Sequence, residues 1–186
     1  MCLPAYAQAH APIQGLNEFA NGFVHPFLTP PHLLVLLGLG LLLGQRRPLR
    51  LPEPLAAFAA CAAAGLLGAA MYTVAGVPPT VFILLGLCAG ALVALGRSLP
   101  ISARVTLCAV SGLALGLDSG VEAAIGGAAR AKTLVATWIS LSLCVVNAAF
   151  YVSRLPARQW VQTGVRVVGA WIVAIGVLML AFALRR

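Results

Sequence analysis

The sequence predicts an all-α membrane protein, a polytopic bundle of about six transmembrane helices. Of its 186 residues, 61% are hydrophobic and only 9% are charged, whereas about a quarter of the residues of an ordinary soluble domain are charged. The mean hydropathy is +1.00, and a soluble domain of this size could not bury so much apolar surface. The apolar residues form long continuous runs instead of the short alternating segments of a transmembrane barrel.

Six apolar segments are close to the length of roughly 20 residues that a spanning helix needs. They cover residues 25–44, 54–75, 78–96, 101–117, 132–152 and 162–184. Turn signals such as Arg46-Arg47-Pro48 and Val77-Pro78-Pro79 separate them. No linker is long enough to divide the chain, so we expect a single six-helix domain over residues 23–186, preceded by an extracytoplasmic segment over residues 1–22.

The positions of the basic residues predict the orientation of the bundle. The net charge is +8, from 12 basic and 4 acidic side chains. Basic residues concentrate in the first, third and fifth connections, namely Arg46, Arg47, Arg50, Arg97, Arg154 and Arg158. The positive-inside rule then makes these connections cytoplasmic and places the N-terminus outside, although Arg185 and Arg186 do not fit this placement. The charge thus orients a multi-pass protein in a bacterial-type inner membrane, and no basic stretch indicates a nucleic-acid partner.

Small residues four positions apart predict close packing of helices in the lipid bilayer. They are Gly40, Gly44, Gly86, Gly90, Gly112 and Gly116. Packing within one bundle is the favoured interpretation, and a homo-oligomer contact is the alternative. The five cysteines show no CxxC spacing, so we interpret them as small buried hydrophobic residues.

The extreme N-terminus contains Ala7-Gln8-Ala9, which fits the A-x-A pattern of a signal-peptide cleavage site. Residues 1–9 would then be the remnant of a signal peptide. Cleavage would make His10 the first residue, and its amine and imidazole could together chelate a metal ion.

Ionisable residues at membrane depth are costly to bury, so they mark candidate functional positions. His25 and His32 are seven residues apart and would share a face of a continuous helix. Three nearby prolines instead favour a helix that begins near Pro30 and leaves His25 on an irregular segment. That segment could bring both imidazoles to one ion, and neutral imidazole binds Ni, Co, Cu and Zn. The alternative is a pair of interfacial histidines at a helix start.

Asp118 and Glu122 lie four residues apart at the end of the fourth segment, on the same predicted outer side as the two histidines. Two histidines and two carboxylates at one depth would form a site at which a divalent cation enters. The alternative is that the carboxylates cap and solvate the outer loop and pair with Arg130 or Lys132. We expect no covalently bound cofactor and no enzymatic activity, because the chain contains no catalytic triad pattern, HExxH motif or glycine-rich phosphate loop.

The first segment, HPFLTPPHLLVL, resembles a motif of the HupE/UreJ family of nickel and cobalt permeases, which are associated with hydrogenase and urease gene clusters. The family pattern there is HPxxGxDHxxAM. His25, Pro26 and His32 match it, whereas Thr29 stands in place of the glycine and Pro31 in place of the aspartate.

The fourth segment also resembles the family, whose pattern there is His-Gly-x-Glu. This chain reads LGLD, so Gly116 matches, Leu115 replaces the histidine and Asp118 replaces the glutamate. The resemblance covers most of the chain and implies a permease for a divalent metal ion. Because protonated imidazole cannot bind a metal, we expect uptake to weaken below about pH 6.

Two other functions are retained as alternatives. The absence of the family's Asp and His favours a membrane accessory or assembly protein that serves a metalloenzyme or a redox complex without transporting metal. A haem anchor with His25 and His32 as ligands is the weaker alternative, because the chain has no histidine after residue 32.

Overall fold

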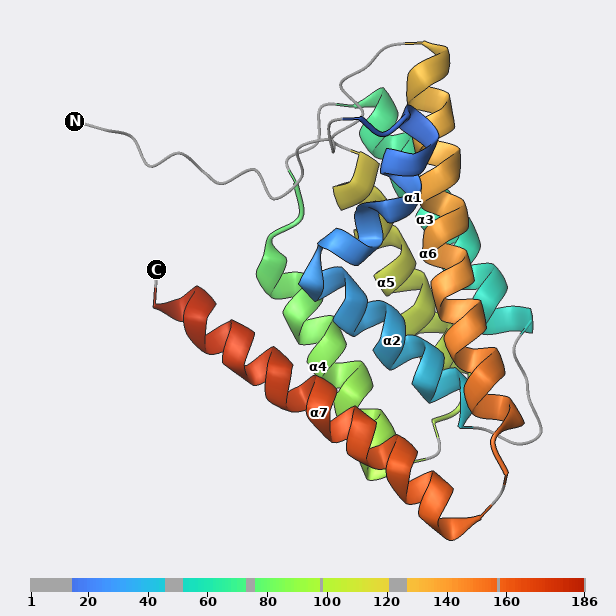
Figure 1. The fold of residues 1–186 in the computed structure, drawn as a ribbon, viewed down its shortest axis with the longest axis vertical. Coiled ribbons are helices and arrows are strands. Elements are labelled where there is room, and N and C mark those ends of the chain that lie inside the picture. Colours follow the sequence, from blue (N-terminus) through green and yellow to red (C-terminus); the bar gives the residue numbers. More distant parts are fainter. Residues whose placement is uncertain are drawn as a thin grey trace.

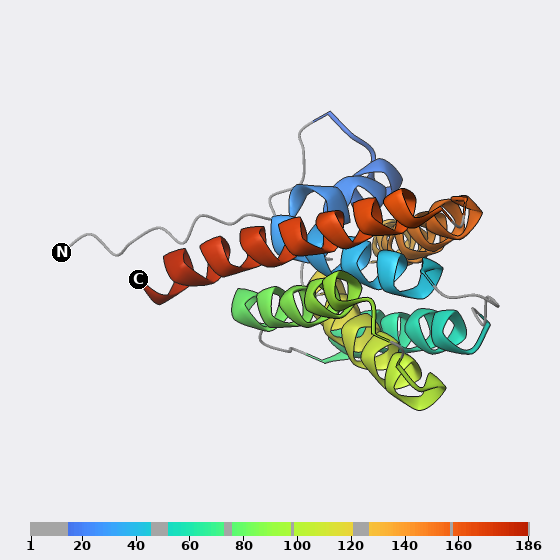
Figure 2. The same ribbon diagram turned by 90° about the horizontal axis from the view of Figure 1, so that it is seen from below.

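The structure, a computed structural model, forms a bundle of helices (Figure 1; Figure 2). It describes residues 15–45, 52–72, 76–97, 99–120, 127–156 and 158–185. Across these ranges the regular structure is helical, with no strand. The helices are α1 (Glu18–Leu28), α2 (Pro30–Gly44), α3 (Pro52–Met71), α4 (Pro79–Leu95), α5 (Ile101–Gly120), α6 (Ala128–Arg154) and α7 (Gln159–Leu184).

Helices α3, α5, α6 and α7 are each long and apolar enough to cross a membrane. Helices α1 and α2 together form a fifth candidate, bent by 78° at the break between them. Helix α4 is apolar but only 17 residues long. The helical membrane bundle predicted from composition is therefore confirmed in its helical character, and the count of six crossings stays a prediction.

The bend between α1 and α2 has its cause in two consecutive prolines. Pro30 and Pro31 open α2 at positions where their missing N–H groups have no intrahelical partner. Thr29, which precedes them, is extended with φ −107° and ψ 97°, because a residue before proline avoids the helical region. The predicted helix start near Pro30 is confirmed. The expectation that His25 lies on an irregular segment was wrong, because α1 is helical from Glu18 to Leu28.

Hydroxyl groups of α6 hold α1 in place beside it. Pro26 lies inside α1 and has no N–H to donate to the carbonyl of Gly22. The hydroxyl of Thr137 donates to that carbonyl at 3.0 Å, and the hydroxyl of Ser140 donates to the carbonyl of Phe23 at 2.6 Å. Ser and Thr side chains commonly satisfy backbone groups that proline frees within a membrane.

Helix α2 is the centre of the bundle, and most of its residues are buried. It packs mainly against α4 and α6. The core around it includes Leu36 and Leu39 of α2, Phe58 of α3, Phe82 of α4 and Leu115 of α5. A helix that is apolar on all sides is typical of this buried position.

The glycines predicted to mediate packing lie against neighbouring helices of the same chain. A Cβ atom on Gly40 or Gly44 would collide with α6, on Gly86 with α2, and on Gly90 with α7. A Cβ atom on Gly112 or Gly116 would meet the backbone of α3. Close approach of backbones is what small residues provide between membrane helices.

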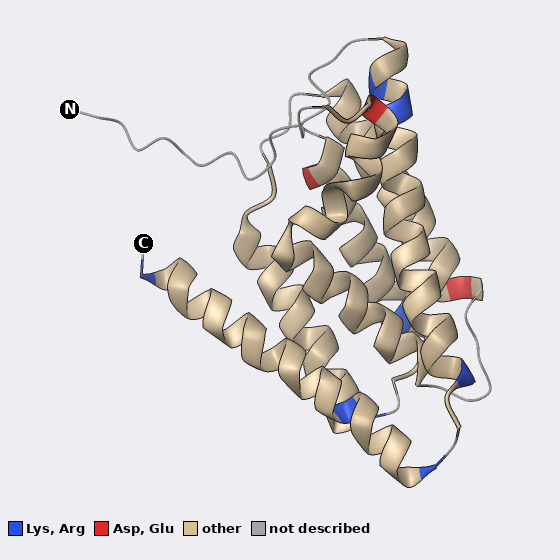
Figure 3. Cartoon of the chain, in the orientation of Figure 1, with Lys and Arg blue, Asp and Glu red and all other residues tan. Residues whose placement is uncertain are grey.

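The end of the bundle that carries the α6–α7 connection is called the basic end here and is defined by Arg154 and Arg158 (Figure 3). Polar contacts join neighbouring helices at this end. There the amide of Gln45 donates to the carbonyl of Val93 at 3.2 Å. The guanidinium of Arg166 donates to the carbonyl of Leu95 at 2.9 Å. A cation at the C-terminus of α4 satisfies a carbonyl and complements the helix dipole.

Candidate metal site

His32 lies in the first turn of α2, just after the bend at Thr29, and its side chain is fully buried. Its backbone N–H donates to the carbonyl of Thr29 at 2.9 Å. The ring packs edge-on against Phe82 of α4, with 4.5 Å between the ring centroids. The proline-induced bend and the aromatic wall together fix the position of the imidazole.

Asp118, in the last turn of α5, joins three segments of the chain. Its Oδ2 lies 3.0 Å from Nε2 of His32, and its Oδ1 accepts a hydrogen bond of 3.0 Å from the backbone N–H of Val77. Only 12% of the side chain is exposed. Val77 precedes α4 and His32 lies in the first turn of α2, so the carboxylate meets the N-terminal ends of two helices, where negative charge is favourable.

His25 lies in the last turn of α1, on the other side of the bend. The centroid of its ring is 5.8 Å from that of His32, and the rings are inclined by 64°. Two imidazoles that share one ion through bonds of about 2.1 Å place their centroids about 5–6.5 Å apart, for coordination angles between tetrahedral and linear. The bend therefore brings the two rings to a separation that a shared ion permits.

The hydrogen-bond pattern of His32 suggests how each of its ring nitrogens is used. When Nε2–H donates to Asp118, the lone pair lies on Nδ1. Nδ1 is buried and has no hydrogen-bond partner among the residues that the structure describes. The hydroxyl oxygen of Thr29 is also buried without a partner in that part of the chain. A histidine that binds metal through one nitrogen and donates to a carboxylate through the other is a recurring arrangement in proteins.

The remaining predicted ligands are not placed by the structure. Glu122 and His10 both lie outside the described residues. Within the described ranges, no group of three or more His, Cys, Asp or Glu side chains could hold a metal ion. The described part of the predicted site thus consists of His25, His32 and Asp118, with the last as a partner of His32.

Two features of the site were missed by sequence reasoning. The backbone N–H of Val77 orients Asp118, and a backbone donor has no residue type by which a sequence could reveal it. Thr29 was noted only as a departure from a pattern, yet its hydroxyl lies next to the bend. Its place directly before two prolines was the available signal.

The two departures from the family patterns differ in their structural setting. Pro31 contributes to the start of α2 and to the bend. Leu115 is fully buried in the apolar core with Leu36 and Phe82. The position where the family pattern has a histidine is therefore part of the hydrophobic packing in this chain.

A family model described as HupE / UreJ protein matches residues 1–179. A search of curated proteins gave no match, and a search of solved structures gave none. The matching family is associated with nickel or cobalt uptake or with accessory roles for hydrogenase and urease, and it is a permease or accessory family, not one known for catalysis. With nearly the whole chain matched, this membrane protein belongs to the HupE/UreJ family.

Proposed function

We propose that this chain is a membrane permease for a divalent transition-metal ion, with nickel or cobalt as its cargo. The imidazoles of His25 and His32 supply the first ligands, and Asp118 holds His32 in the tautomer that exposes Nδ1. The observation that carries the proposal is the fully buried His32, which contacts Asp118 through Nε2 and has no partner for Nδ1 among the described residues. The metal ion is the cargo of the protein and is bound reversibly.

The chemistry of the donors suits this cargo. Imidazole nitrogen binds nickel, cobalt, copper and zinc, and the selectivity among them depends on geometry and availability. A third donor would complete the site, and we infer that the hydroxyl of Thr29 is a candidate, because it is buried without a partner among the described residues. His10 and Glu122 remain proposed ligands from the sequence.

In this proposal the protein lies in a bacterial-type inner membrane with its N-terminus outside. The bent α1–α2 pair and the short α4 complete six crossings together with the four long helices. With that orientation we infer that the imidazole pair at the bend faces the outer side, where it meets the incoming ion. Asp118 at the end of α5 lies at the same depth because it contacts His32.

The test is nickel binding and nickel uptake by the purified full chain, reconstituted in vesicles. His32→Ala should lose both binding and uptake. Asn147→Ala is a matched control, because the hydrogen bond of the Asn147 amide within the described residues runs along its own helix, to the carbonyl of Leu143. Uptake that is the same in His32→Ala as in the parent chain would reject the permease proposal.

A second candidate function is that of a non-transporting accessory protein. The burial of Leu115 in the apolar core favours it, because this chain offers no ligand where the family pattern has a histidine. This function predicts that a partner protein copurifies with the chain and that His32→Ala leaves the partner's activity intact.

A further inference from the structure

Thr29 lies at the bend between α1 and α2, and only 8% of the residue is exposed. It follows His25 by four positions and precedes His32 by three. Spacings of three and four residues bring side chains to one side of a helical turn. Although the chain bends at Thr29, the centroids of the two imidazole rings lie 5.8 Å apart. Thr29 thus occupies the point of the chain at which the two histidines converge.

The hydroxyl of Thr29 does not cap the helix that it precedes. Thr29 is the N-cap residue of α2, and an N-cap hydroxyl ordinarily accepts from the backbone N–H of the second or third helical residue. The first two residues are Pro30 and Pro31, which have no N–H. The N–H of the third, His32, donates to the carbonyl of Thr29, and no side-chain cap bond is formed. The two prolines that bend the chain therefore also leave the hydroxyl without its usual donor.

The hydroxyl of Thr29 does not donate to a helix carbonyl either. The hydroxyls of Thr133, Thr137 and Thr163 each donate to the carbonyl four residues earlier, as Ser and Thr within helices often do. Thr29 is extended and lies between two helices, and its hydroxyl oxygen is buried with no partner among the described residues. A buried hydroxyl without a partner destabilises a folded protein.

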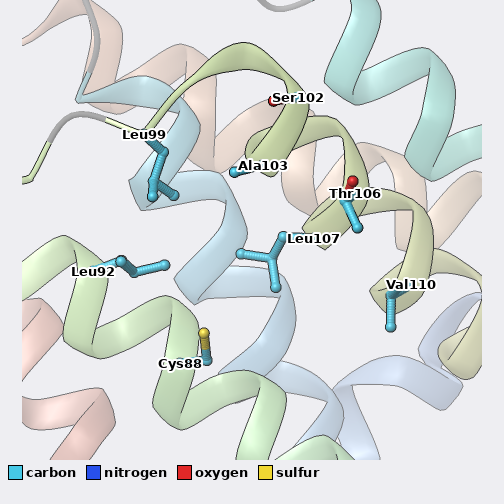
Figure 4. Close-up of a pocket in the computed structure, with 8 residues that line it drawn as sticks. All are labelled: Cys88, Leu92, Leu99, Ser102, Ala103, Thr106, Leu107 and Val110. Atoms are coloured by element: carbon cyan, nitrogen blue, oxygen red, sulfur yellow. The ribbon is translucent and has the colours of Figure 1, made fainter.

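Other polar groups and hollows of the bundle offer less to a cation. The hydroxyls of Ser111 and Ser119 on α5 are also buried without a partner in the described ranges, but neither belongs to the bend. The cleft between α4 and α5, with a volume of about 490 Å³, is lined mostly by apolar side chains (Figure 4). At the bend, by contrast, two buried polar atoms without a described partner lie one turn apart, namely the hydroxyl oxygen of Thr29 and Nδ1 of His32.

We propose that Thr29 is a direct ligand of the transported ion, and that its hydroxyl oxygen and Nδ1 of His32 bind the ion together. The proposal rests on the proposed permease function and changes its site from two imidazoles to a mixed nitrogen and oxygen site. The hydroxyl binds through a lone pair and keeps its proton, so no proton is released at Thr29. In the metal-free chain the buried hydroxyl lowers stability, and binding of the ion to the folded state offsets this loss.

Thr29→Val tests this exchange of stability for binding, because valine has nearly the same shape as threonine and lacks the hydroxyl. The purified full chain in detergent is melted without metal and with nickel, and the Kd for nickel is measured by isothermal titration calorimetry. Without metal, we expect the Tm of Thr29→Val to rise by about 2–4 °C. We expect its Kd for nickel to increase at least about tenfold, because even the partners of metal ligands contribute about 10–100-fold. The rise in Tm caused by the same nickel concentration should therefore be smaller than in the parent chain.

Two further variants separate the hydroxyl from the shape of the side chain and from general effects of the substitution. Thr29→Ser keeps the hydroxyl, so we expect its Kd for nickel to stay close to that of the parent chain. Thr163→Val makes the same chemical change on α7, where the hydroxyl donates to the carbonyl of Gln159 at 3.0 Å. This matched control should leave the Kd for nickel unchanged.

A lower Tm of metal-free Thr29→Val than of the parent chain would give the hydroxyl a structural role and overturn the proposal. An unchanged Kd in Thr29→Val would also overturn it, and nickel binding by the parent chain would then leave the permease function standing. A Kd in Thr29→Ser as weak as that in Thr29→Val would assign the effect to packing and likewise overturn the proposal. Absence of nickel binding by the parent chain would instead reject the permease function, and this inference with it.

Discussion

Replacing Asp118 by asparagine removes the negative charge of the site while leaving the volume of the side chain almost unchanged. The carboxylate accepts from two N–H groups, one on His32 and one on Val77. An amide presents one oxygen and one NH₂ group. Its oxygen can therefore accept from His32 or from Val77, but not from both. If its oxygen stays with Val77, its NH₂ faces Nε2 of His32. The imidazole must then move its proton to Nδ1, the nitrogen that we assign to the metal.

The size of this effect follows from the role of Asp118 as a partner of a ligand. Substitution of such a partner typically lowers metal affinity about 10–100-fold, which is about 1.4–2.7 kcal/mol of binding free energy. Isothermal titration calorimetry with nickel measures this change in Kd directly. Asp118→Ala should in addition reduce the free energy of unfolding, because the fully buried His32 and the half-buried Val77 both lose their acceptor, at up to about 1–3 kcal/mol for a buried donor.

Two results would refute this reasoning. An unchanged Kd in Asp118→Asn would show that the carboxylate does not hold His32 for metal binding. A loss of affinity far beyond about 100-fold, the upper range for ligand partners, would instead make Asp118 a direct ligand. Asn147→Ala serves as the control for both variants, since its amide lies on α6 and bonds within its own helix.

Three further predictions concern packing and pH. Thr137→Val removes the hydrogen bond to the carbonyl of Gly22. It should lower the free energy of unfolding by about 0.6–1.7 kcal/mol, the range for interhelical hydrogen bonds in membranes. Denaturant titration in detergent measures this loss, and an unchanged free energy of unfolding would contradict the prediction. Gly116→Ala places a methyl group against the carbonyl of Ala62 and should destabilise the bundle by about 1–3 kcal/mol, whereas Gly164→Ala, with open space around it, should not. Nickel uptake should fall below about pH 6, because protonated imidazole has no lone pair for the metal; constant uptake between pH 7 and about pH 5 would argue against imidazole ligands.

The class of fold was predictable because lipid imposes one strong rule. Long apolar segments in a membrane form helices, since all backbone groups must be satisfied within the segment. The start of α2 was predictable for a similar reason, because Pro30 and Pro31 restrict Thr29 before them. The helical state of His25 was not predictable, because it depends on carbonyl groups of α1 that hydroxyls of α6 satisfy.

The candidate site was predictable in its residue types but not in its contacts. The sequence predicts that His32 and Asp118 lie at the same depth. In the structure Nε2 of His32 lies 3.0 Å from Oδ2 of Asp118. That contact depends on the packing of α5 beside α2, a tertiary relation that spacing along the chain does not contain. The backbone donor of Val77 depends on the same packing.

The central claim is that the imidazoles of His25 and His32 bind a divalent metal ion. The most direct measurement is elemental analysis of the purified full chain after equilibration with nickel, beside the His25→Ala/His32→Ala double variant prepared in the same way. We expect stoichiometric nickel in the parent chain and none in the double variant. Equal nickel content in the two preparations would contradict the claim.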